Sequence, residues 1–254
     1  MESLAQELID AIIGCLPSSD MRSCSLVAKR WRRTSQQCTF AHVMFRSERR
    51  VVLWYTNIPQ DPDGIPSYVQ TSSFFGIEWQ DPTLFGRVVK CFSNLKSLSF
   101  IDGPIPEPGV LDGSVPFGEF SQQITYLALH AVTCSTTTMM SLILSLPNLQ
   151  DLSLIETETG EDETAISLGE SRSKVLGLLQ LQDVRASVVT AITQCSFTSR
   201  KMYMSGLSEV DMARLLAPSS QTLAILELGG MCIQPGFPRM RGGVDRSPRL
   251  VPSG

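Results

Sequence analysis

The stretch that decides the fold opens the chain and reads LAQELIDAIIGCLPSSDMRSCSLVAKRW, residues 4–31. Its first half carries five apolar residues at steps of one, three, one and three: Leu8, Ile9, Ile12, Ile13 and Leu16. A helix of about 3.6 residues per turn places such positions on one stripe. Ser3 followed by Gln6 indicates a capped helix start. Pro17 predicts the end of this helix, because a proline ring blocks the preceding turn.

Two further short helices are expected in this region. Small polar residues at 18–20 offer cap oxygens for a helix over residues 20–27, and a third helix covers residues 28–38. In the third helix Trp31 faces inward, whereas four basic residues face outward: Lys29, Arg30, Arg32 and Arg33. Three helices of this size cannot cover all their apolar side chains among themselves. We therefore expect the excess apolar surface to face a partner protein or the next domain.

The order of residues in this stretch, L-x-x-E-L-I-x-x-I-I-x-x-L-P-x-x-D-M-x-x-C-S-L-V-x-K-x-W, resembles the F-box. The version it resembles is common in large fungal families, and the resemblance extends to about residue 40. The F-box usually has proline directly after its first leucine, whereas this chain has Ala5 there. We expect this departure to weaken partner binding without abolishing it.

The F-box resemblance implies a partner. The helices would dock on a Skp-type adaptor protein, which joins them to a cullin–RING ubiquitin ligase. On this resemblance, the residues that contact the adaptor or support those contacts are Leu4, Leu8, Ile9, Ile12, Ile13, Leu16, Leu26, Val27 and Trp31. Glu7 is a candidate contact at the rim of the same surface. The alternative is a plain helical cap on a larger domain of the same chain.

Composition narrows the class of protein. A hydrophobic content of 43% in 254 residues supports a sizeable core. A net charge of −4 argues against a protein whose main task is to bind nucleic acid. The acidic start argues against a signal peptide, and the longest apolar stretch, residues 139–146, is too short to span a bilayer. We therefore expect a cytoplasmic or nuclear protein that contacts no membrane.

The seven cysteines contain no C-x-x-C pair. This spacing favours reduced, buried thiols over a zinc site or a disulfide framework. The sequence also lacks a P-loop, a G-x-S-x-G motif and an H-E-x-x-H motif, and it has two histidines. We expect no metal, no cofactor, no catalytic residues and no enzymatic activity.

Residues 41–64 read as a linker between two domains. The basic run RSERR at 46–50 indicates a solvated surface or, alternatively, a nuclear-import signal. The apolar run VVLWY at 51–55 predicts a short strand. The turn cluster PQDPDGIP at 59–66 marks the domain boundary.

Beyond this boundary the chain repeats the pattern L-x-x-L-x-L. Clear copies begin at Leu95, Ile124, Leu149, Leu176 and Leu223, and degenerate copies begin at Val69 and Ser199. By subtraction, consecutive copies start 23–29 residues apart, and residues 65–230 resemble leucine-rich repeats. The triplets SNL at 93–95 and PNL at 147–149 begin equivalent turns.

The segments between these copies have helical spacing over residues 82–92, 136–146, 186–195 and 209–216. Each unit is thus one strand plus one helix, and stacked units form a parallel sheet with helices outside. The predicted fold is α/β: a three-helix F-box over residues 1–40, a linker over 41–64, a short leucine-rich-repeat solenoid over 65–230, and a disordered tail over 231–254.

Strand geometry predicts where a target protein would bind. Successive strand residues point to opposite faces of a sheet, so the neighbours of the repeating leucines would line the concave surface. The residues expected to contact a target are Tyr126, His130, Asp151, Lys201, Tyr203 and Glu227. The two tyrosines would be rigid aromatic anchors. The alternative is that these residues form an ordinary hydrated surface with two exposed tyrosines.

The sequence therefore predicts a substrate-recognition adaptor of an SCF-type (cullin–RING) E3 ubiquitin ligase. Its helices would hold the ligase machinery through the Skp-type adaptor, and its repeats would hold an unknown target protein. The alternative function is a leucine-rich-repeat scaffold that binds a partner with no link to ubiquitin.

Overall fold

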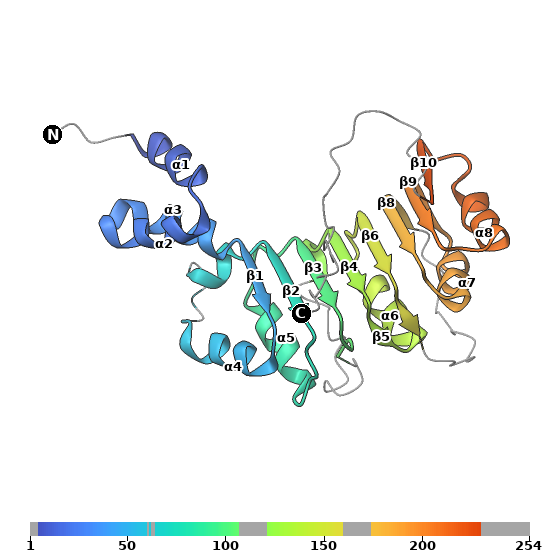
Figure 1. Ribbon diagram of the computed structural model, residues 1–254, viewed down its shortest axis with the longest axis horizontal. Coiled ribbons are helices and arrows are strands. Elements are labelled where there is room, and N and C mark those ends of the chain that lie inside the picture. The colour runs from blue at the N-terminus through green and yellow to red at the C-terminus, as the bar shows by residue number, and fades with distance from the viewer. Residues whose placement is uncertain (1–4, 60, 62–63, 107–120, 160–173, 230–254) are drawn as a thin grey trace, which may run out of the picture.

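The computed structural model describes residues 5–59, 61, 64–106, 121–159 and 174–229. Three helices come first, and a parallel sheet with helices on one face follows (Figure 1). The predicted adaptor residue Leu4 and the predicted tail over 231–254 lie outside the described residues.

The first three helices are α1 (Gln6–Gly14), α2 (Ser18–Val27) and α3 (Lys29–Phe40). The α1 helix begins after Ala5 without a side-chain cap. It ends at Gly14, three residues before Pro17, because the N–H groups of Cys15 and Leu16 already close shorter i→i+3 turns. Pro17 instead directly precedes α2.

The segment predicted as a linker contributes to the folded sheet. It contains strand β1 (His42–Phe45), which pairs in parallel with β2 (Thr71–Phe75), and helix α4 (Glu48–Asn57). The strand predicted over residues 51–55 is therefore wrong. In α4, the buried Val51 and the half-buried Trp54 lie three residues apart on one helical face. Trp54 packs edge-on against Phe45 and Phe92, with ring centroids 6.0 and 5.1 Å apart.

Among the described residues the main sheet has eight strands, and each pairs in parallel with the strand that follows it in the order β1-β2-β3-β4-β6-β8-β9-β10. The remaining bounds are β3 (Ser97–Ile101), β4 (Tyr126–His130), β6 (Asp151–Ile155), β8 (Lys174–Gln182), β9 (Phe197–Ser205) and β10 (Ile225–Leu228). Strands β5 (Thr133–Cys134) and β7 (Glu158–Thr159) form a separate parallel pair.

The strands lie where the L-x-x-L-x-L copies predict them, and the copies are in register. The second apolar residue of each copy from β3 onward is the lateral partner of the next, as the series Leu98, Leu127, Leu152, Leu179, Met202 and Leu226 shows. Since side chains alternate along a strand, this register places every one of these residues on the same face of the sheet.

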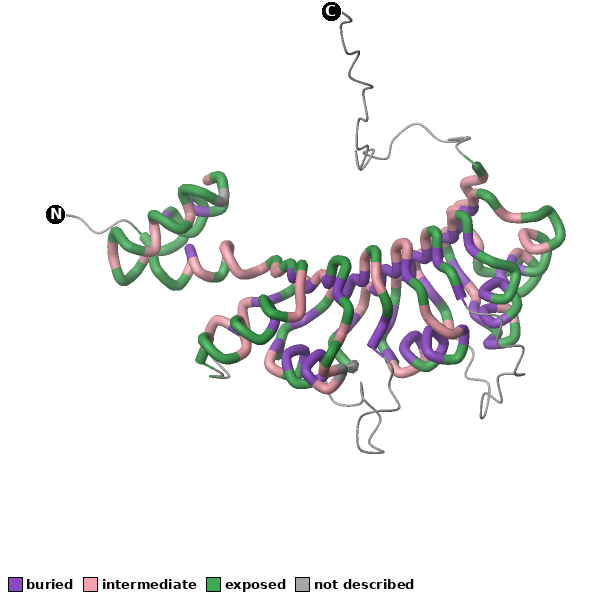
Figure 2. Tube along the Cα trace, turned by 60° about the horizontal axis from the view of Figure 1, so that its bottom comes forward, coloured by how far each residue is buried: buried purple, intermediate pink, exposed green. Residues whose placement is uncertain are grey.

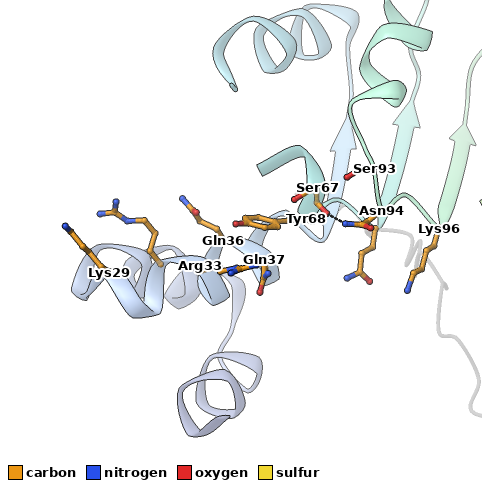
Figure 3. A pocket seen from close by; sticks show the side chains of 11 residues that line it. Lys29, Arg33, Gln36, Gln37, Ser67, Tyr68, Ser93, Asn94 and Lys96 are labelled. Atoms are coloured by element: carbon orange, nitrogen blue, oxygen red, sulfur yellow. Dashed lines mark hydrogen bonds between the residues drawn. The ribbon is translucent and has the colours of Figure 1, made fainter. Parts of the chain in front are cut away.

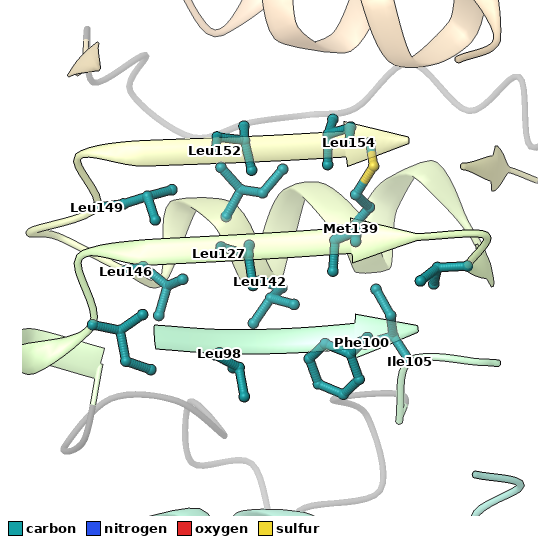
Figure 4. Close-up of a cluster of buried hydrophobic side chains, with 14 of the residues drawn as sticks. Leu98, Phe100, Ile105, Leu127, Met139, Leu142, Leu146, Leu149, Leu152 and Leu154 are labelled. Carbon is teal, nitrogen blue, oxygen red and sulfur yellow. The ribbon is translucent and has the colours of Figure 1, made fainter. Parts of the chain in front are cut away.

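Helices cover that face. They are α4, α5 (Pro82–Lys90), α6 (Thr136–Leu144), α7 (Ala186–Gln194) and α8 (Glu209–Ser219), with short 3-10 turns η1 (Ile65–Tyr68) and η3 (Ser121–Gln123) between units. Figure 2 shows the buried parts of the chain gathered between strands and helices. In Figure 4, Leu127 and Leu152 from the strands lie beside Met139 and Leu142 from α6. We name the opposite side of the sheet the helix-free face, because no helix in the described part of the chain covers it.

Each strand of the main sheet from β2 onward is followed by a residue with positive φ. These residues are Gly76, Asp102, Ala131, Glu156, Asp183, Gly206 and Gly229, with φ between 46° and 69°. Where the next strand allows it, their N–H groups extend the ladder: those of Asp102 and Ala131 donate to the carbonyls of His130 and Ile155 at 2.8 Å. The left-handed conformation costs non-glycine residues about 1–3 kcal/mol, and its recurrence shows that the units share one backbone path.

Gly206 is the position on this path where a side chain is least tolerated. Its φ is +69°, and an added Cβ would overlap the carboxylate of Asp183. We expect Gly206→Ala to lower the free energy of unfolding by about 2–3 kcal/mol, measured by urea denaturation. Gly229→Ala is the matched control, because its φ is +46° but an added Cβ meets nothing within 4 Å. Equal losses in the two variants would contradict the overlap with Asp183.

The predicted equivalence of the SNL and PNL turns has a structural counterpart. The side-chain amide of Asn94 donates to the carbonyl of Ser67 at 2.7 Å, and that of Asn148 donates to the carbonyl of Gln122 at 2.6 Å. The two bonds span 27 and 26 residues. Each asparagine therefore ties its own unit to the unit before it.

Candidate protein-interaction site

Each of the first two helices exposes a pair of large apolar residues. Leu26 and Val27, at the end of α2, are 84% and 70% exposed, and Leu8 and Ile12, one turn apart on α1, are 53% and 43% exposed. Scattered single apolar residues are normal on a surface, whereas here each helix exposes two that are neighbours on that helix. We name these four residues the apolar patch.

The helical stripe predicted from the sequence divides into two rows. Ile9 and Ile13 are fully buried, whereas Leu8 and Ile12, each one position earlier, belong to the apolar patch. Both rows have the i,i+4 spacing of one helical face. Among the other predicted adaptor residues, Glu7 is exposed, and Leu16 and Trp31 are half-buried. Ile9 and Ile13 therefore pack inside the helical segment, whereas Leu8 and Ile12 are exposed for contact with another protein.

A polar cluster joins α1 to α3. The hydroxyl of Thr34 donates to Asp10 Oδ1 at 2.6 Å, and the amide of Gln6 donates to the same oxygen at 2.7 Å. Hydrogen bonds from Thr34 and then from Gln6 lower the pKa of the Asp10 carboxyl. The carboxylate is thus the form that these donors stabilise. The hydrogen bond from Thr34 to Asp10 thus links α3 to α1, the helix that carries Leu8 and Ile12.

The predicted target-binding residues all lie in strands of the main sheet, and all six are half-buried. Alternation along the strands places them opposite the leucines, on the helix-free face. The register brings Tyr126 beside Asp151, and Tyr203 beside Glu227. Lys201 lies two strands from Asp151, with Leu178 of β8 between them.

His130 is part of a hydrogen-bonded chain across three strands. Its Nε2 lies 3.2 Å from the hydroxyl of Ser153, which donates to Gln180 Oε1 at 3.3 Å. Burial lowers the pKa of the His130 imidazole, and the nearby Glu156 carboxylate opposes this effect. Burial raises the pKa of both Tyr126 and Asp151. The centre of the helix-free face is therefore a partly dry polar surface, suited to hydrogen bonds with a protein partner.

The first two strands add residues to this face that the sequence did not indicate. Met44 of β1 and Phe75 of β2 are exposed, and alternation puts them on the helix-free side, opposite the buried Phe45 and Phe74. The guanidinium of Arg46 lies over the Phe75 ring, 5.9 Å from its centroid. Met44 lies in the segment predicted as a linker, and Phe75 follows the degenerate copy that begins at Val69.

The described residues contain neither a candidate metal site nor a candidate membrane span. Within these ranges, no group of three His, Cys, Asp or Glu side chains is placed to hold a metal ion. No helix there is long and apolar enough to cross a membrane. The six described cysteines are free, but only Cys195 is buried, which corrects the expectation that the thiols lie in the core.

The arrangement of an uncovered apolar patch and a long polar sheet face indicates a protein that binds other proteins. Comparison with known families identifies the first part: residues 1–42 match the family model of the F-box domain. The matched segment contains α1, α2, α3 and the apolar patch. The F-box domain indicates, in general terms, an adaptor role of the SCF type. The chain matches none of the curated proteins with which it was compared.

Proposed function

We propose that this protein is the substrate-recognition subunit of an SCF-type ubiquitin ligase, in which the apolar patch binds a Skp-type adaptor. The observation that carries the proposal is the exposure of Leu26 and Val27 within a segment that matches the F-box domain. Full burial of such a side chain stabilises a complex by about 1.5–3 kcal/mol. Both side chains are largely exposed in the chain by itself, so most of this free energy is available to a partner.

The backbone at Ala5 supports the same proposal. Ala5 occupies the place where the F-box pattern usually has proline, and its φ is −59°. A proline ring fixes φ near −65°, so the chain has the geometry of the usual residue without the residue itself. The expected weakening of adaptor binding then comes from the lost ring and its conformational restriction, and not from a different chain path.

The sheet region is, on this proposal, a leucine-rich-repeat solenoid that holds the target protein on its helix-free face. Support comes from the strand order, the in-register leucines and the recurring positive-φ residues. Tyr126 and Tyr203 would be anchors, and the half-buried polar residues around them would supply specificity. The protein itself would form and break no covalent bond. It would raise the effective concentration of a target lysine near the charged ubiquitin carrier.

The test is co-expression of the full chain with a Skp-type adaptor, followed by affinity purification and size-exclusion chromatography. We expect a stable one-to-one complex. A chain that captures protein partners but never recovers the adaptor would instead support a repeat scaffold with no link to ubiquitin.

A further inference from the structure

A basic cleft lies where the helical part of the chain meets the sheet (Figure 3). It has a volume of about 1060 Å³ and is bounded by α3 on one side, and by η1 and the turn before β3 on the other. We name it the junction cleft. Its cationic residues are Lys29, Arg32, Arg33 and Lys96, and Tyr68 and Asn94 lie between them.

The charge of the junction cleft is opposite to that of the whole chain. The chain has a net charge of −4, whereas four cations and no acidic residue are among the described residues that line the cleft. Lys29, Arg32 and Arg33 lie at i, i+3 and i+4 in the first turns of α3, where the helix dipole adds positive potential. Neither of the two ion pairs found among the described residues involves these cations.

The cleft is elongated and rich in hydrogen-bond donors. In Figure 3, the side chains run in one row from Lys29 along α3, past Tyr68, to Asn94 and Lys96. Amides of Gln36 and Gln37 occupy the middle of this row. The hydrogen bond from Asn94 to the carbonyl of Ser67 links the turn before β3 to η1, on the side of the cleft opposite α3. Cations at both ends and neutral polar groups between them suit a ligand that is extended and carries separated negative charges.

We infer that the junction cleft binds an extended acidic segment of a partner protein. Its volume lies at the upper limit of the range of about 300–1,000 Å³ that small-molecule sites occupy, so a single small anion would leave much of it empty. A peptide backbone would supply carbonyl acceptors for the amides, and acidic side chains would meet the cations. Single-stranded nucleic acid is disfavoured, because such sites stack bases on several aromatic side chains and Tyr68 is the one aromatic residue among the described lining residues.

This inference goes beyond the proposed function and does not require it. The cleft is lined by both the F-box segment and the first units of the sheet, whereas the apolar patch lies on α1 and α2. An acidic segment in the cleft would therefore bridge the two parts of the chain and hold their relative orientation. Its binding can be measured without a Skp-type adaptor, so failure of one proposal leaves the other standing.

The test uses the full chain and a short fluorescent peptide of alternating glutamate and serine, followed by fluorescence anisotropy. We expect binding that weakens with added salt, because the contacts are charged and exposed. Lys29→Gln/Lys96→Gln removes one cation from each end and should weaken binding about tenfold. The matched control is Arg30→Gln/Arg49→Gln, since both arginines are exposed and neither lines the cleft. It removes the same charge and should leave the affinity unchanged.

Two further probes identify the source of the negative charge. A peptide with phosphoserine in place of serine that binds more tightly would support the cleft and identify phosphate groups as its preferred ligand. Equal affinity for both peptides would support carboxylates. The inference is overturned if the peptide does not bind, if the control pair weakens binding as much as the cleft pair, or if a single-stranded oligonucleotide of equal charge binds more tightly than the peptide.

Discussion

Changing Leu26 and Val27 together to aspartate is expected to weaken capture of a Skp-type adaptor at least about 100-fold. These two side chains are the most exposed apolar residues of α2. Their burial by a partner would be lost, and two carboxylates would have to be removed from water without a partner charge. The measurement is the affinity of the full chain for the purified adaptor, by calorimetry or surface plasmon resonance.

The matched control for this prediction is Val52→Asp/Leu53→Asp. These residues form an exposed apolar pair on α4, outside the segment that matches the F-box domain. Because both pairs are exposed, we expect both variants to keep the circular dichroism of the unmodified chain. Unchanged adaptor affinity in Leu26→Asp/Val27→Asp, or an equal loss in the α4 control, would exclude the apolar patch as the docking surface.

Truncation of Leu179 to alanine should lower the free energy of unfolding by about 3 kcal/mol. Leu179 lies in β8, is 1% exposed, and is the lateral partner of Leu152 and Met202. Its removal would leave a cavity in the core between the strands and the helices. The repeat units on both sides pack against this position, so the cavity could not close. Urea denaturation monitored by circular dichroism gives the change, read at an unchanged m-value.

Leu178 is the matched comparison, because it directly precedes Leu179 in the same strand. It points to the helix-free face and is half-buried. We expect Leu178→Ala to cost less than about 1 kcal/mol. Similar losses at the two positions would mean that the register of β8 differs from the one described.

The repeat pattern made most of the sheet predictable. A leucine at the second position of each copy identifies both the strand and the face that it buries, so β3, β4, β6 and β8 lie where expected. The helices between them follow from apolar spacing in the same way. The helix α4 could not be predicted in this way. Its VVLWY segment is a short apolar run, and periodicity alone cannot assign such a run to a helix or a strand. Packing of Trp54 between Phe45 and Phe92 decides for the helix.

The candidate sites were only partly predictable, for a related reason. The stripe of α1 identified its apolar residues but not which row faces outward, since that depends on where α3 packs. The Asp10–Thr34 contact joins residues 24 positions apart, and the junction cleft joins α3 to a turn near residue 94. Such polar contacts leave no periodic trace in the sequence. They become visible only when the chain path is known.

The sheet order has a consequence for how this protein can change. Each strand of the main sheet pairs only with its immediate neighbours in that order, so duplication of one strand–helix unit would keep every other junction intact. A gain of this kind would lengthen the helix-free face by one strand spacing, about 4.8 Å. The length of this face could therefore change in discrete steps, while the first 42 residues, which match the F-box domain, remained as they are.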